Sequence, residues 1–169
     1  MSEIKKQLFA KAPLTLTLSH KGRGKINFDN THNHTRRYSM KVPKIGLLTC
    51  NSGSSNSGAL TGIAAMEVLK EFGGDLVGIC SLPALANEIP RQVLTVRDLE
   101  HLIIVDGCRN SCAMKVADKL SLSHDAYVNL EDDLKIGKFG PFSTFQYSDE
   151  DVNKVKEAIR ARINQFSQE

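Results

Sequence analysis

The 169-residue chain has no long apolar run and no recognisable export signal. A membrane-spanning helix needs about 20 consecutive apolar residues, and none of its apolar stretches approaches that length. No charged, then apolar, then small-residue pattern opens the chain. We therefore expect a cytoplasmic protein with no membrane partner. In that reducing compartment its four cysteines are expected to be metal ligands or redox thiols rather than disulfides.

Several catalytic and metal-binding signatures are also missing. The paired CxxC knuckles of a zinc finger do not occur, and the closest cysteines, Cys108 and Cys112, form a CxxxC pair. The loop after Cys50 lacks the Gly-Lys-Ser/Thr ending of a P-loop. No arginine lies between Cys50 and Arg91, which argues against a phosphatase with a cysteine nucleophile. No Ser-His-Asp or paired-carboxylate arrangement is evident either, so the sequence predicts no reaction.

Charge is distributed unevenly along the chain. Residues 1–39 contain eight Lys/Arg and two acidic residues, a net charge of +6 that leaves −3 for residues 40–169. The acidic remainder predicts no nucleic-acid-binding surface. We expect residues 1–39 to be a disordered basic leader, with Met40 as a natural translation start. The alternative is a basic arm or a metal-feeding segment that uses His32 and His34.

Strand and helix patterns alternate from residue 44 onward. Four apolar runs predict strands, at residues 45–49, 76–80, 101–105 and 125–130. Helices are predicted over residues 59–72 and 112–120, with a helical turn over residues 83–87 before a break at Pro90. After a cap at Ser148, an apolar stripe at helical spacing predicts the last helix: Val152, Val155, Ile159, Ile163 and Phe166. The alternation predicts that residues 40–169 form a three-layer α/β sandwich with a mostly parallel sheet of about four strands.

The cysteines follow the predicted strands. Cys50, Cys80 and Cys108 each come at or just after a strand end, and Cys112 lies in the first turn of the next helix. Parallel strands place their carboxyl ends on one edge of the sheet, so the four thiols are expected to converge there. Four thiolates within tetrahedral reach suit zinc. Cys80, which is flanked by apolar residues, can equally be a small core residue.

Three neighbouring features have two interpretations each. Asp106 can support or replace a metal ligand, or it can cap the turn that follows its strand. Arg109 can balance the charge of the thiolates, or it can be a solvated surface residue. The Gly/Ser/Asn-rich loop over residues 51–58 can hold an anion through backbone N–H groups, or it can be a tight turn that packs the next helix on the sheet.

Residues 105–113, VDGCRNSCA, resemble the signature of the DGC-domain family, which is named for its Asp-Gly-Cys. The loop at residues 50–53 with Asn56, together with the lone Cys80, resembles the family's other two cysteine positions. The resemblance runs from about residue 44 to residue 130 and does not cover residues 1–39. The family is described as zinc-binding proteins of unknown function. This resemblance implies four zinc ligands here, Cys50, Cys80, Cys108 and Cys112, and implies no reaction.

We therefore expect a Zn²⁺-binding protein with a four-cysteine site and a structural, sensing or metal-carrier role. One alternative is a thiol redox or sulfur-carrier protein that uses Cys108 and Cys112. Another is an electron carrier with an iron–sulfur cluster on the same four cysteines. The sequence leaves open whether the protein is an enzyme.

Overall fold

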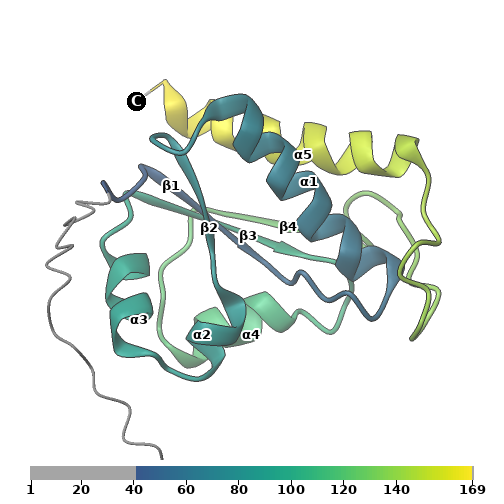
Figure 1. Ribbon diagram of the computed structural model, residues 1–169, viewed down its shortest axis with the longest axis horizontal. Coiled ribbons are helices and arrows are strands. Elements are labelled where there is room, and N and C mark those ends of the chain that lie inside the picture. The colour runs from purple at the N-terminus through teal and green to yellow at the C-terminus, as the bar shows by residue number, and fades with distance from the viewer. Residues whose placement is uncertain (1–40, 169) are drawn as a thin grey trace, which may run out of the picture. The chain divides into compact units, whose positions relative to one another are not determined.

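A computed structural model describes residues 41–168, which form an α/β fold around one four-stranded sheet (Figure 1). All pairings are parallel and the strand order is β2-β1-β3-β4. The strands are β1 (Ile45–Thr49), β2 (Val77–Cys80), β3 (His101–Asp106) and β4 (Ala126–Asn129). The helices are α1 (Asn56–Phe72), α2 (Leu82–Ala86), α3 (Pro90–Arg97), α4 (Cys112–Lys119) and α5 (Asp149–Ser167). The predicted α/β class and parallel four-stranded sheet are confirmed, whereas the predictions for residues 1–39 lie outside the described residues.

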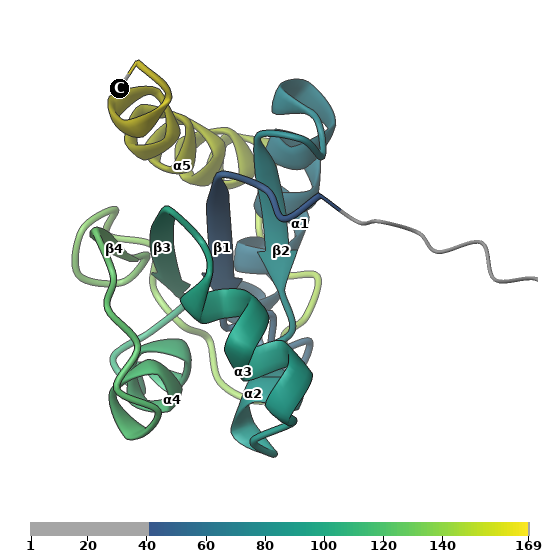
Figure 2. The same ribbon diagram turned by 90° about the vertical axis from the view of Figure 1, so that its left-hand side faces the viewer.

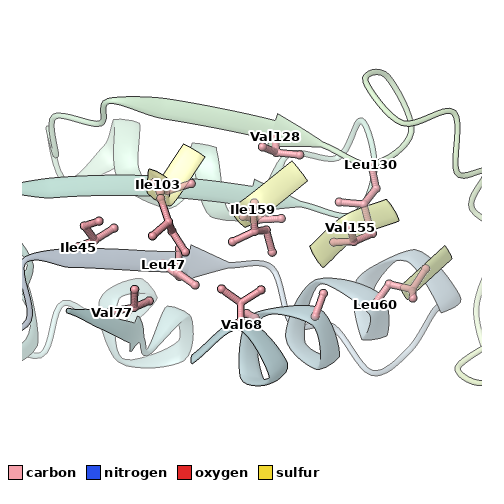
Figure 3. Close-up of a cluster of buried hydrophobic side chains, with 14 of the residues drawn as sticks. Ile45, Leu47, Leu60, Val68, Val77, Ile103, Val128, Leu130, Val155 and Ile159 are labelled. Atoms are coloured by element: carbon pink, nitrogen blue, oxygen red, sulfur yellow. The ribbon is translucent and has the colours of Figure 1, made fainter. Parts of the chain in front are cut away.

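The two central strands, β1 and β3, are continuous apolar runs because both of their faces are covered. Leu47 and Ile103 belong to one hydrophobic cluster, which α1 and α5 complete (Figure 3). Leu48 and Ile104, the next residue in each strand, belong to a second cluster on the opposite face. Successive side chains of a strand point to opposite faces, so a strand between two apolar layers needs apolar residues at every position.

Helices lie on both faces of the sheet, as the end-on view shows (Figure 2). α1 and α5 cover the face of the first cluster, and their buried residues include Leu60, Val155 and Ile159. α2, α3 and α4 cover the other face, contributing Leu85, Val96 and others to the second cluster. Among the described residues, no helix combines the length and the apolar character needed to cross a membrane.

The largest differences from the sequence prediction are at the starts of two helices. α1 begins at Asn56, three residues before the predicted start, because Ser55 caps it by accepting a hydrogen bond from the Gly58 N–H (3.3 Å). Pro90 starts α3 instead of breaking the chain. Proline suits the first helical position because the N–H that it lacks would have no partner within the helix. The last helix begins as predicted, with a capping box between Ser148 and Asp151.

The strand order creates a switch point between β1 and β3. From β1 the chain passes to β2 on one side, and it then returns to β3 on the other side of β1. The connections that leave β1 and β3 therefore run to opposite faces of the sheet. In parallel α/β sheets, ligands commonly bind at the carboxyl ends of the strands at such a switch point.

Candidate functional site

Cys50 lies at this switch point, directly after β1. Its backbone N–H donates to the carbonyl oxygen of Val105 (2.9 Å), which extends the pairing of β1 with β3 by one residue. Burial raises the pKa of the Cys50 thiol to about 11, and the charges of Cys112 and Asp106 act in the same direction. Backbone N–H groups that face the sulfur oppose this shift. The Cys50 thiol is thus protonated at neutral pH.

Gly107 allows the end of β3 to pack against the start of α1. A Cβ at this position would lie 2.5 Å from the carbonyl oxygen of Ser57 and 2.8 Å from the amide nitrogen of Gly58. Both are backbone atoms of the first turn of α1, which cannot move aside as a flexible side chain can. The glycine of the Asp-Gly-Cys sequence is therefore needed for close packing, and this packing brings the Cys50 loop beside the Cys108 loop.

Asp106 caps α4. Its Oδ1 accepts a hydrogen bond from the Ala113 N–H (2.9 Å) and its Oδ2 accepts one from the Met114 N–H (3.0 Å). The residue is 1% exposed, and burial raises the pKa of its carboxyl group against the effect of these N–H donors. Both carboxylate oxygens are thus used by the helix, so the structure shows the capping role. The same capping fixes the first residue of α4, the exposed Cys112.

Cys108 is buried and has a lysine beside it. Its side chain is 8% exposed, and Lys138 Nζ donates to its Sγ at 3.7 Å. Its carbonyl oxygen accepts a hydrogen bond from the side chain of Asn129 (3.1 Å), which ties the loop after β3 to the end of β4. The contact places an ammonium group beside the Cys108 sulfur. Lys138 is a candidate functional residue that the sequence analysis missed, because nothing in its spacing links it to a cysteine 30 residues earlier.

Asn56 determines where Lys138 lies. Its Nδ2 donates to the carbonyl oxygen of Gly137 (2.9 Å), and its Oδ1 accepts a hydrogen bond from the Phe139 N–H (3.0 Å). Asn56 also donates its own backbone N–H to the side-chain oxygen of Ser143 (3.2 Å). The residues on both sides of Lys138 are thus fixed to the first turn of α1, so the loop between β4 and α5 covers the carboxyl edge of the sheet.

Cys80 has a different setting from the other three cysteines. It ends β2 and pairs in register with Leu48, two residues before Cys50. Gly46 on the neighbouring strand leaves room for this sulfur. A Cβ added at Gly46 would lie 3.0 Å from the Cys80 sulfur and would also clash with Leu99. Burial raises the pKa of this thiol to about 12. Cys80 is partly buried and packs against the second hydrophobic cluster.

A family model described as the DGC domain matches residues 46–159. The chain belongs to the DGC-domain family. The match covers the whole sheet of this DGC domain and ends within α5, beyond the residue 130 to which the sequence resemblance extended. Comparison with curated proteins and with solved structures gives no match.

The cysteines of this DGC domain do not form a ready-made metal cage. Within residues 41–168, no group of three or more His, Cys, Asp or Glu side chains is close enough to hold a metal ion. All four cysteines have the chemistry of zinc ligands, and Cys50, Cys108 and Cys112 follow the carboxyl ends of β1 and β3 along the chain.

The remaining residues named from the sequence have surface or structural settings. Arg109 is largely exposed, and its Nε donates to Asp132 Oδ1 at 2.8 Å, which agrees with a surface role. The loop over residues 51–58 leads into α1, where the N–H of Asn51 donates to the side-chain oxygen of Thr61 (2.8 Å). His101 begins β3, at the opposite end of that strand from the cysteines, and stacks on Phe166 with ring centroids 4.6 Å apart.

Proposed function

We propose that this DGC-domain protein binds a thiophilic metal ion, with zinc as the preferred ion, at the switch point between β1 and β3. The observation that carries the proposal is the arrival of Cys50, Cys108 and Cys112 at the carboxyl ends of two neighbouring central strands. Zinc favours cysteine thiolates, and tetrahedral sites of this kind can be structural or can exchange their metal. The family's description as zinc-binding agrees with this assignment.

The surroundings of the thiols support a site that forms upon metal binding. Burial holds the Cys50 thiol protonated, with a pKa of about 11, so this group must lose its proton to become a ligand. Zinc uptake is then coupled to proton release and strengthens as the pH rises toward that value. The reducing cytoplasm is the compartment that we propose, because it keeps such thiols available.

A second candidate function is thiol chemistry at Cys108 and Cys112, as a redox pair or a sulfur carrier. The specific observation in its favour is Lys138, whose ammonium group donates to the Cys108 sulfur (3.7 Å). Exposed Cys112, at the start of α4, is accessible to a second thiol or to a sulfur donor. The cysteines could instead hold an iron–sulfur cluster, which is a further hypothesis. The colour of such a cluster distinguishes it from bound zinc.

Metal content tests the proposal directly. Protein purified without added metal is analysed for its elements and by visible spectroscopy, and we expect one zinc per chain without colour. Cys112→Ser should weaken zinc affinity by at least about 100-fold, because a ligand is lost. Lys115→Ala, on an exposed residue of the same helix, is the matched control and should bind as the wild type does. Iron with visible absorption would favour the cluster, and metal-free protein with two readily oxidised thiols would favour the redox pair.

A further inference from the structure

We propose that Cys108 and Lys138 are a modification site, at which hydrogen peroxide leads to a covalent bond between the cysteine sulfur and the lysine nitrogen. The product is a sulfenamide that joins the end of β3 to the loop between β4 and α5. This inference goes beyond the proposed function and requires no metal. It concerns a pair of side chains that the sequence does not connect.

The lysine side of the pair is held in place by α1. Lys138 Nζ lies 3.7 Å from Cys108 Sγ, although 30 residues separate the two along the chain. Asn56 accepts a hydrogen bond from the Phe139 N–H (3.0 Å) and donates one to the Gly137 carbonyl oxygen (2.9 Å). Because both neighbours of Lys138 are fixed, its backbone keeps the amine within reach of the sulfur. The long, flexible lysine side chain supplies the remaining approach.

The cysteine side is fixed as well. The Cys108 carbonyl oxygen accepts hydrogen bonds from the Asn129 side chain (3.1 Å) and from the Ser111 N–H (3.0 Å). The Cys108 thiol is free, and the residue is 8% exposed. A sulfenic acid formed at this sulfur would be attacked by the lysine, by another thiol or by more oxidant. Burial limits access from solvent, so the neighbouring amine is favoured.

The chemistry has two balanced steps. Peroxide oxidises the Cys108 thiol to a sulfenic acid and is itself reduced to water. The Lys138 ammonium group releases one proton to solvent, and its nitrogen then attacks the sulfur. The S–N bond forms while the S–O bond breaks, and the hydroxyl group leaves as water with a second proton from the amine. Two equivalents of a thiol reductant restore the thiol and the amine and become a disulfide.

The cross-link would fasten the loop that covers the carboxyl edge of the sheet. It closes a loop of 30 residues that includes α4 and β4. Such a closure restricts the unfolded chain more than the folded one, as a disulfide does. The oxidised protein should therefore unfold at a higher urea concentration than the reduced protein. The loop over the carboxyl edge should also exchange its amide hydrogens more slowly after oxidation.

Peptide mapping by mass spectrometry tests the proposal. Full-length Cys112→Ser protein is treated with a chelator and then with peroxide, because the exposed Cys112 thiol would otherwise compete for oxidant. We expect a peptide that contains Cys108 joined to one that contains Lys138, lighter by two hydrogen atoms than the two together. Trypsin should not cleave after the modified Lys138, and dithiothreitol should restore both peptides.

Two arginine substitutions, made in the Cys112→Ser protein, are matched controls. Lys138→Arg keeps the positive charge but lacks the amine, and it should lower the yield of the cross-linked peptide at least about tenfold. Lys135→Arg should leave the yield unchanged, because the Lys135 amine donates to the carbonyl oxygen of Asp132 (2.6 Å) instead of to a cysteine. Circular dichroism confirms that each variant is folded.

The proposal is overturned if folded protein yields Cys108 as a free thiol, a sulfinic acid or a disulfide, with no link to Lys138. A cross-link that survives in Lys138→Arg would also overturn it. Zinc content does not enter this readout. Failure of the cross-link therefore leaves the proposed metal site standing, and a protein without zinc leaves the cross-link standing.

Discussion

The ends of β1 and β3 and the end of β2 present similar sequences but different structures. Each has a cysteine at or just after an apolar run, followed by a polar residue. At β1 and β3 the chain leaves toward opposite faces, and the cysteine environment contains backbone N–H groups, a carboxylate and a lysine. At β2 the cysteine packs against an apolar layer. The difference shows that position in the strand order, rather than the local sequence, sets the surroundings of each cysteine.

The physical cause is the place of each strand in the sheet. β2 is an edge strand, and it ends beside Leu48, before the end of its neighbour. β1 and β3 are the central pair, and their pairing continues to Thr49 and Val105. Beyond these residues, the Cys50 N–H still donates a hydrogen bond to the carbonyl oxygen of Val105. The switch point lies between the strands whose following connections diverge. Cys80, on the shorter edge strand, lies outside this point and packs against the second hydrophobic cluster.

The largest expected effect comes from tightening the close packing at the end of β3. Gly107→Ala places a Cβ within 2.8 Å of three backbone atoms of Ser57 and Gly58, so β3 and α1 must move apart. We expect a loss of about 3 kcal/mol in the free energy of unfolding, measured by urea denaturation. Gly53→Ala is the matched control, because a Cβ there meets no atom within 4 Å, and it should change stability little. Equal losses in the two variants would show that the close packing is not the cause.

A pH titration of stability should distinguish Cys80 from Cys50. Burial raises the pKa of Cys80 to about 12 in the folded protein, whereas an unfolded cysteine titrates near 8.5. The folded state therefore holds a proton that the unfolded state loses, and this contribution to stability is complete below about pH 8.5 and is lost as the pH rises toward 12. Its slope is about 1.4 kcal/mol per pH unit.

Removing that thiol should flatten the alkaline part of the profile. In metal-free protein, Cys80→Ala should reduce the fall in the free energy of unfolding between pH 9 and pH 12, measured by urea denaturation at each pH. Cys50→Ala should act only up to about pH 11, and less strongly, because its thiol is more exposed and its pKa is lower. An unchanged profile for Cys80→Ala would mean that this thiol is open to water and is not part of the apolar layer.

The sequence revealed the sheet more fully than the site. Four apolar runs predicted four strands, and the apolar stripe after Ser148 predicted α5, because burial on two faces and helix amphipathicity leave periodic signals. The predicted convergence of all four cysteines assumed that every strand ends at the same level, whereas β2 ends beside Leu48, two residues before Cys50. Lys138 and its fixation by Asn56 depend on contacts over more than 80 residues of chain, and no local pattern records such contacts.

The smallest expected effect concerns the loop that covers the carboxyl edge. Phe142 has a φ of 64° and is 94% exposed, while its N–H donates to the carbonyl oxygen of Ser54 (2.7 Å). The loop is thus held by its backbone and not by the aromatic ring. Phe142→Asn should stabilise the protein by about 0.5 kcal/mol, because asparagine adopts positive φ more readily. Phe145→Asn, exposed but outside the positive-φ region, should leave the melting temperature unchanged, and a loss of stability in Phe142→Asn would instead show that the ring packs against the protein.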